Sequence, residues 1–382
     1  VTNTGGTEAT AISAAALPAP FSYKGGTYPG TAGTCATSLM PAAACTIVVT
    51  YAPLSTGSHA EDLDLTFSNG VAAVHALRSL KGVAVTPANL SISDGPTYDF
   101  GSKPIGSVTD HVFTVSNSGG YAAASVAGSG LASPFSFKGG SYPGTGGTCG
   151  ASLAGGANCT IVVSYAALSA SVSTDTVDLS FNDGNTTQTS HRDLTATGVT
   201  PATLVFSNAP SYDFGPVATG GHAETTLLVT NTGDYMATTM AGAGLAAPFT
   251  FKGGTYPGTG GTCGTQLAGG VNCSVVVVFA PTTLATLSDT VELSYFNGAT
   301  SQQAVRDVQG VGTTPATLAV SNGPTFDFGA LPYGASSTST LTVTNTGGVP
   351  ASAMTGAGLS APFTFLGGTY PGTGGTCAAT LA

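Results

Sequence analysis

Apolar and polar residues alternate in short runs along the chain, and no segment shows the 3.6-residue period of a helix. Residues 111–117, for example, place Phe113 and Val115 on one face of a strand. Similar runs occupy residues 90–92, 98–101, 134–137, 159–165, 177–181 and 192–196. We therefore predict about seven short strands in this stretch, with residues 122–132 forming strand plus loop. The pattern is typical of an all-β protein with immunoglobulin-like antiparallel β-sandwiches.

A glycine-rich stretch recurs at a fixed interval. Lys-Gly-Gly-Ser-Tyr-Pro-Gly-Thr-Gly-Gly-Thr-Cys ends at Cys149, and closely similar stretches end at Cys35, Cys263 and Cys377. The interval is constant, because 149 − 35, 263 − 149 and 377 − 263 all equal 114. A fixed interval of domain size predicts structural modules repeated in series.

Thr-Pro pairs mark the predicted boundaries between modules, because proline and the residue before it are restricted to few conformations. The pairs begin at Thr86, Thr200 and Thr314. The stretches are repeat one (1–85), repeat two (86–199), repeat three (200–313) and repeat four (314–382). We expect repeat one to lack its N-terminal strands and repeat four its C-terminal half, as in a window on a longer protein. Strand donation from a neighbouring subunit is the alternative.

Two cysteines per repeat, with nine residues between them, predict one local disulfide in each complete loop. The expected bridges are Cys35–Cys45, Cys149–Cys159 and Cys263–Cys273, with Cys377 left free. Closing about 11 residues stabilises a fold by roughly 3 kcal/mol in the chain-entropy model. A zinc site is a weaker interpretation, since no histidine recurs at an equivalent position.

The overall composition favours an extracellular or cell-surface protein. Disulfides form in oxidising compartments, and only 7% of the residues are charged. The net charge of −10 argues against nucleic-acid binding, which requires a basic surface. No apolar run reaches the roughly 18 residues of a membrane-spanning helix.

The motifs carry a family resemblance. Tyr98-Asp99-Phe100-Gly101, Val115 to Gly120, Gly130 to Phe137 and the glycine-rich Cys-x9-Cys loop resemble the Hydin-type immunoglobulin-like repeats of bacterial secreted proteins, known as choice-of-anchor D domains. The resemblance covers every repeat. It implies large, repetitive, exported or surface-attached proteins, and it implies no catalytic residues.

Polar residues that recur at one position are candidates for a defined role. They are Lys24, Lys138 and Lys252; Arg78, Arg192 and Arg306; and Asp99, Asp213 and Asp327. The main interpretation is structural ion pairs or hydrogen bonds to loop carbonyls, with Arg192 the expected partner of Asp99. An isopeptide crosslink between Lys138 and Asn117 is the alternative.

No other pattern points to chemistry. No Gly-x-Ser-x-Gly motif leads into a helix, so we expect no enzyme activity and no cofactor. Calcium between modules is disfavoured, because residues 83–88 and 310–316 contain no acid. We expect a structural stalk or filament building block on a bacterial surface, whose partners are neighbouring modules and other copies of itself. The alternative is a multivalent module that binds a glycan or polymer on a host or prey surface through the recurring Tyr-Pro-Gly loop.

Overall fold

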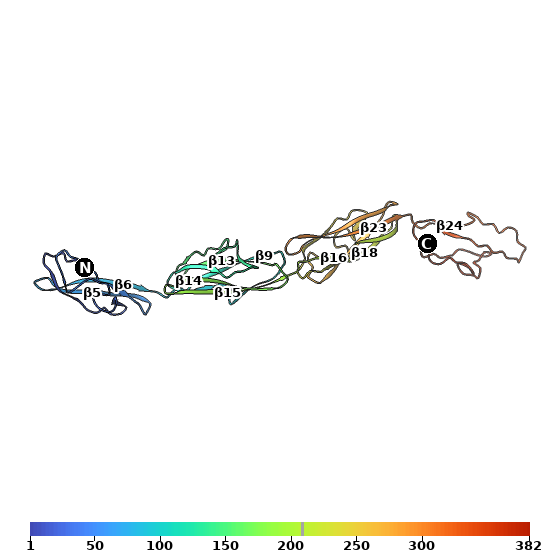
Figure 1. Ribbon diagram of the computed structural model, residues 1–382. Helices are drawn as coiled ribbons and strands as arrows, with labels where there is room; N and C mark the ends of the chain where they lie inside the picture. Colours follow the sequence, from blue (N-terminus) through green and yellow to red (C-terminus); the bar gives the residue numbers. More distant parts are fainter. Residues whose placement is uncertain (208–209) are drawn as a thin grey trace. The chain divides into compact units, whose positions relative to one another are not determined.

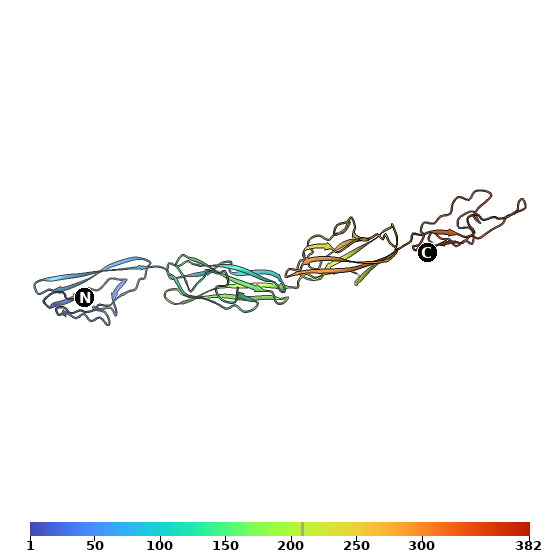
Figure 2. The ribbon, with the colours of Figure 1, turned by 90° about the horizontal axis from the view of Figure 1, so that it is seen from above.

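The computed structural model describes residues 1–207 and 210–382 (Figures 1 and 2). Among these residues the regular secondary structure consists of β-strands, with no helix. The chain divides into two compact units. Unit one comprises Val1–Asp99, Asp110–Tyr165 and Thr174–Thr195, and unit two comprises Phe100–Thr109, Ala166–Ser173 and Ala196–Ala382. The predicted all-β, immunoglobulin-like class is confirmed, whereas the predicted repeat boundaries remain predictions.

Repeat one forms a four-stranded sheet and a two-stranded one. The larger sheet has the order β3-β1-β5-β6. Its strands are β1 (Ala9–Ala14), β3 (Ser38–Leu39), β5 (Gly57–Ser68) and β6 (Ala73–Ala84). The smaller sheet pairs β2 (Phe21–Tyr23) with β4 (Val49–Tyr51). Strands β5 and β6 form a long antiparallel hairpin, drawn in blue (Figures 1 and 2).

Repeat two contains two larger sheets, with the orders β12-β10-β14-β15-β8 and β11-β13-β9-β7. The strands of the first are β8 (Thr97–Pro104), β10 (Ala123–Ser129), β12 (Ser152–Leu153), β14 (Val172–Asn182) and β15 (Thr187–Val199). Those of the second are β7 (Leu90–Ile92), β9 (Val108–Asn117), β11 (Phe135–Phe137) and β13 (Asn158–Ala166). Every predicted strand is present, most of them longer than predicted, and the two-residue strand β12 is an addition.

Repeat three repeats this arrangement in sheets β16-β18-β21-β20 and β17-β23-β22-β19. The first contains β16 (Leu204–Phe206), β18 (Ala223–Asn231), β20 (Phe249–Phe251) and β21 (Asn272–Phe279). The second contains β17 (Ser211–Ala218), β19 (Thr238–Ala243), β22 (Thr286–Phe296) and β23 (Ser301–Thr313). The sequence predicted antiparallel sheets, but β17 runs parallel to β23. The chain reaches β17 by crossing from one sheet to the other, so no hairpin constrains its direction.

The core of repeat three consists of side chains that alternate inward along the strands. Leu227 and Val229 on β18 are fully buried, as are Val275, Val277 and Phe279 on β21. These side chains pack against Val291 and Leu293 of the second sheet. The inward pair predicted from the sequence therefore lies in the core here, as do Phe113 and Val115 in repeat two.

Repeat four contains a short antiparallel pair, β24 (Leu318–Val320) and β25 (Val343–Asn345). Leu341 occupies the position of Leu227, 114 residues later, but 45% of its surface is exposed. Leu227 is covered by β21 and β22, and residues 314–382 contain no counterpart of these strands. Burial at this position therefore depends on the strands that cover Leu227 in repeat three.

Candidate functional site

The glycine-rich loop is closed by a disulfide in repeats one to three. The bonds are Cys35–Cys45, Cys149–Cys159 and Cys263–Cys273, the pairs expected from the spacing. All of these cysteines are buried, and Cys377 is a free thiol. Each bridge lies within one repeat, so the loop is stapled locally.

The loop also continues the sheet beside strand β13. Lys138 N donates to Val162 O at 2.9 Å, and Val162 N donates to Pro143 O at 2.8 Å. A Cβ on Gly144 would lie 2.2 Å from Val162 O, and its φ is +90°. Only glycine permits both the conformation and the close approach. Repeat three has the equivalent hydrogen bonds, so the loop is a fixed structure rather than a free arm.

The tyrosine of the loop packs inward. The ring of Tyr142 meets Phe137 edge-on, with centroids 5.7 Å apart, and its hydroxyl donates to Gly150 O at 3.4 Å. A Cβ on Gly128 would lie 2.4 Å from the Tyr142 ring. Repeat three has the same arrangement, and burial raises the pKa of Tyr256 to about 12. The tyrosine thus supports the loop from within.

Repeat one differs at this point. Ala14 stands where repeats two to four have Gly128, Gly242 and Gly356. The buried hydroxyl of Tyr28 has no hydrogen-bond partner among the described residues. The additional methyl group and the loss of the tyrosine hydrogen bond therefore occur in the same repeat.

The recurring lysine forms an ion pair in repeats two and three. Lys138 Nζ lies 2.7 Å from Asp110 Oδ2, and Lys252 Nζ lies 2.6 Å from Glu224 Oε2. The side chains in both pairs are between 34% and 45% exposed. In repeat four both members are replaced: Leu366 stands at the lysine position and Thr338 at the acidic position. The two positions have therefore changed together, as expected for interacting residues.

The structure does not bring Lys138 and Asn117 together as a crosslinking pair. Lys138 Nζ is paired with Asp110, whereas the side-chain amide of Asn117 bonds to backbone groups. Hydrogen bonds from Lys138 and Ser164 hold the pKa of Asp110 below its usual range. The contacts of the two side chains therefore give the Lys138–Asn117 crosslink no support.

Asn117 instead holds the strand end to the loops around it. Its Nδ2 donates to Tyr121 O at 2.8 Å and to Leu153 O at 3.1 Å. Its Oδ1 accepts from Asn89 N and Gly119 N, both at 3.0 Å. Only 2% of Asn117 is exposed, and Asn231 makes the equivalent bonds in repeat three. The signal was in the sequence, since asparagine occupies this position in all four repeats, at Asn3, Asn117, Asn231 and Asn345.

Arg192 directs its guanidinium at backbone carbonyls. It donates to Ile92 O, Ser93 O and Pro96 O. These carbonyls belong to the turn where the chain passes from β7 in one sheet to β8 in the other. Arg192 thus makes the hydrogen bonds to loop carbonyls that were one of the two expected interactions, and its pairing with Asp99 remains a prediction. The two other arginines differ: Arg78 is exposed and Arg306 is 1% exposed.

The recurring aspartates are exposed, and Asp99 and Asp213 lie on the outer surface of a sheet. Asp99 alternates with the inward Phe100 on β8. Asp213 accepts from Gly215 N at 2.7 Å and from Gln309 Nε2 at 3.0 Å, and Asp327 accepts from Gly329 N at 2.8 Å. The expected Asp–Arg pairing is wrong for repeat three, because Asp213 lies outside while Arg306 lies inside the sandwich. Desolvation of this carboxylate is therefore not a cost of folding.

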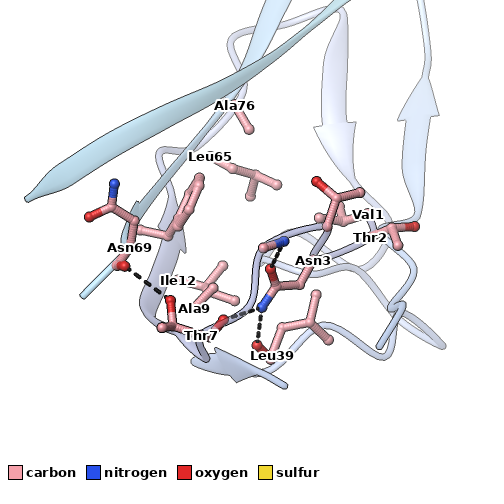
Figure 3. Close-up of a pocket in the computed structure, with 13 residues that line it drawn as sticks. Val1, Thr2, Asn3, Thr7, Ala9, Ile12, Leu39, Leu65, Asn69 and Ala76 are labelled. Carbon is pink, nitrogen blue, oxygen red and sulfur yellow. Dashed lines mark hydrogen bonds between the residues drawn. The ribbon is translucent and has the colours of Figure 1, made fainter. Parts of the chain in front are cut away.

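A cavity of about 270 Å³ lies in repeat one (Figure 3). Ala9, Ile12 and Leu65 line it, and Asn3 closes one end through hydrogen bonds to Thr7 O and Leu39 O. In repeat three, β16 and the first half of β18 pack on the corresponding face, and repeat one contains no residues equivalent to them. The cavity is thus the space that these strands fill elsewhere.

A second hollow, of about 480 Å³, lies on the outer face of repeat three. Its two carboxylates are engaged within the repeat: Asp289 accepts from Ala246 N at 2.8 Å, and Asp307 accepts from Thr290 Oγ1 at 2.9 Å. Among residues 1–207 and 210–382, no cluster of three or more histidine, cysteine, aspartate or glutamate side chains could hold a metal ion. Within the same ranges, no helix is long and apolar enough to span a bilayer.

Comparisons with known proteins identify no family. No family model and no curated protein matches the sequence. Among solved structures, the chain is similar to VesB protease from Vibrio cholerae at 18% identity and a TM-score of 0.24, covering 29% of this chain and 32% of that one. It is similar to extracellular cadherin domains 1–4 of protocadherin gamma B7 at 10% identity and a TM-score of 0.32, covering 68% and 60%. It is similar to the titin I-band fragment I67–I69 at 12% identity and a TM-score of 0.26, covering 78% of this chain and 89% of that one.

The chain thus spans about a third of the VesB chain and 60% of the protocadherin chain. At these identities and scores the likeness carries no conclusion about function. The assignment of the fold rests on the strands and sheets themselves.

Proposed function

We propose that the chain is a structural extracellular repeat protein, a building block of a stalk or filament on a bacterial surface. The observation that carries this proposal is how the recurring polar residues are used. Asn117 and Arg192 bond to the backbone of their own repeat, and Lys138 pairs with Asp110 beside it. Residues used in this way stabilise the module that contains them, as expected of a structural repeat.

The glycine-rich loop supports the same proposal. It is closed by a buried disulfide, and its backbone extends the sheet. Disulfides are typical of secreted and surface proteins. The finer assignment, to Hydin-type repeats of the choice-of-anchor D kind, belongs to this proposal and rests on the motifs around Asp99 and Cys149. The partners are neighbouring repeats and further copies of the chain, and the proposal includes no catalytic step and no cofactor.

The glycan-binding alternative has less support. Tyrosine binds a sugar ring by presenting its face to solvent. The Tyr142 ring is instead held between Phe137 and Gly128, with its hydroxyl bonded to Gly150 O.

The proposal is tested by negative-stain micrographs of the purified native protein at neutral pH, with a glycan array in parallel. We expect rods or ordered filaments in the absence of ligand, and no array signal above that of a Tyr142→Ala/Tyr256→Ala variant. Isolated, unassembled particles together with array binding lost in that variant would contradict the structural function and support the alternative.

A further inference from the structure

The long hairpins of repeats one to three turn through equivalent residues. Asn69 follows β5, Asp183 follows β14 and Asn297 follows β22. They are equivalent because 183 − 69 and 297 − 183 both equal 114. A glycine comes next in each turn, so repeats one and three have Asn-Gly where repeat two has Asp-Gly.

The side chain makes the same hydrogen bonds in all three turns. Asn69 Oδ1 accepts from Val71 N and Ala72 N, both at 2.9 Å. Asn297 Oδ1 accepts from the equivalent backbone amides at 2.9 and 2.8 Å. Asp183 Oδ1 accepts from Asn185 N at 2.7 Å and from Thr186 N at 2.8 Å. The turn therefore holds an amide or a carboxylate in one geometry.

We propose that Asn69 and Asn297 are sites of spontaneous deamidation promoted by their own turns, and that Asp183 shows the product form. The backbone nitrogen of Gly70 attacks Asn69 Cγ and forms an N–Cγ bond. The Cγ–Nδ2 bond breaks, and Nδ2 leaves as ammonia with the proton from the Gly70 nitrogen. Water then opens the cyclic imide to aspartate or isoaspartate.

Two features of the turn assist this step. Glycine places no side chain beside the attacking nitrogen, and even a Cβ added at Gly70 would meet nothing closer than Thr7 Oγ1 at 3.9 Å. Negative charge develops on Oδ1 as the nitrogen attacks, and the two backbone N–H groups already point at that oxygen. Such paired donors stabilise a developing oxyanion.

The fold accommodates the product. In repeat two, hydrogen bonds from Thr186 N and Asn185 N hold the pKa of Asp183 below its usual range, so the carboxylate is the stable form. Conversion at both asparagines would change the net charge from −10 to −12, since each amide becomes one carboxylate. Asn69 should react before Asn297, because it is exposed whereas Asn297 is half-buried and water reaches it less readily.

The chain contains its own control at Asn322-Gly323. Asn322 is exposed and precedes glycine, as Asn69 does. Its side chain accepts no hydrogen bond from the described residues, and its φ is +61°. The pair thus has the same local sequence without the two donors.

The test is a time course of the folded whole chain at mildly alkaline pH, followed by peptide mapping of the amide-to-acid mass shift at the three asparagines. We expect conversion at Asn69 to be at least about tenfold faster than at Asn322, because of the oxyanion donors. Conversion at Asn69 that is no faster than at Asn322 would overturn the proposal.

A parallel incubation in urea removes the donors from every turn. There we expect the rate advantage of Asn69 over Asn322 to disappear. An advantage that persists in the unfolded chain would assign it to neighbouring residues rather than to the turn, and would also overturn the proposal.

Discussion

Thr176 Oγ1 donates a hydrogen bond to Asp193 Oδ1 at 2.9 Å across strands β14 and β15. Repeat three has the same pair in Thr290 and Asp307, at 2.9 Å. In repeat one the residue types are exchanged between the strands, and Ser79 Oγ donates to Asp62 Oδ1 at 2.6 Å. A hydroxyl and a carboxylate thus face each other at this register in three repeats, whichever strand carries which.

Exchange of Thr176 and Asp193 should therefore preserve stability. We expect Thr176→Val to cost repeat two about 0.5–1.5 kcal/mol, the net value of one hydrogen bond. The variant that combines Thr176→Asp with Asp193→Thr should regain most of the loss. Hydrogen exchange of β14 and β15 peptides during urea titration of the whole chain measures both. A double variant less stable than Thr176→Val would show that the pair is incidental.

Asn117→Ala should be among the most destabilising changes in repeat two. It removes the oxygen that accepts from the N–H groups of Asn89 and Gly119, at about 1–3 kcal/mol for each buried group left unpaired. The same urea titration, followed on β9 peptides, measures the loss. Asn158→Ala is the matched control, because Asn158 is exposed. Equal effects from the two variants would refute the anchoring role.

Gly128→Ala should destabilise the disulfide loop, because the new Cβ would lie 2.4 Å from the Tyr142 ring and 2.6 Å from Phe137. Overpacking of this kind costs about 1–3 kcal/mol. Gly150→Ala is the control, since its Cβ would meet nothing within 4 Å. We expect faster hydrogen exchange in residues 137–148 of the first variant only. Unchanged exchange would mean that the ring moves aside at no cost.

Acid should weaken repeat two through Asp110. Its folded pKa is lowered, first by the hydrogen bond from Lys138, so the carboxylate stabilises the fold above the unfolded pKa of about 3.9. That contribution is lost as pH falls through the lower folded pKa. Asp110→Asn should therefore flatten the decline in stability below about pH 4. The pair is exposed, so we expect an effect of at most about 1 kcal/mol in urea titrations across this range. Parallel pH profiles for the two chains would contradict the assignment.

The parts of the fold that depend on local patterns could be predicted from the sequence. Alternation located the strands, and the nine-residue gap located the disulfides. The turn from Ile92 to Pro96 could not be predicted, because it forms where the chain passes from β7 in one sheet to β8 in the other. Its carbonyls face Arg192 only in that arrangement. The sequence therefore could not decide whether Arg192 bonds to a carboxylate or to loop carbonyls.

The lysine partner was missed for a different reason. The acidic position holds Asp110 in repeat two, Glu224 in repeat three and Thr338 in repeat four, so it does not recur as one residue type. Comparing the changes at this position with the loss of lysine at Leu366 would have revealed the pair. Asn117 was noticed but given the wrong partner, because the sequence does not show which buried backbone groups lack hydrogen bonds.

The spacing of the bridged cysteines bears on how the thiols find their partners during oxidation. Seven cysteines can form three bridges in 7 × 15 = 105 ways, and only one of these is native. Each native bridge spans 10 residues, whereas Cys45 and Cys149 are 149 − 45 = 104 apart. Loop closure over 10 rather than 104 residues is favoured by about 2 kcal/mol, or roughly thirtyfold. In the unfolded chain, loop entropy therefore favours a bridge within each repeat over a bridge between repeats.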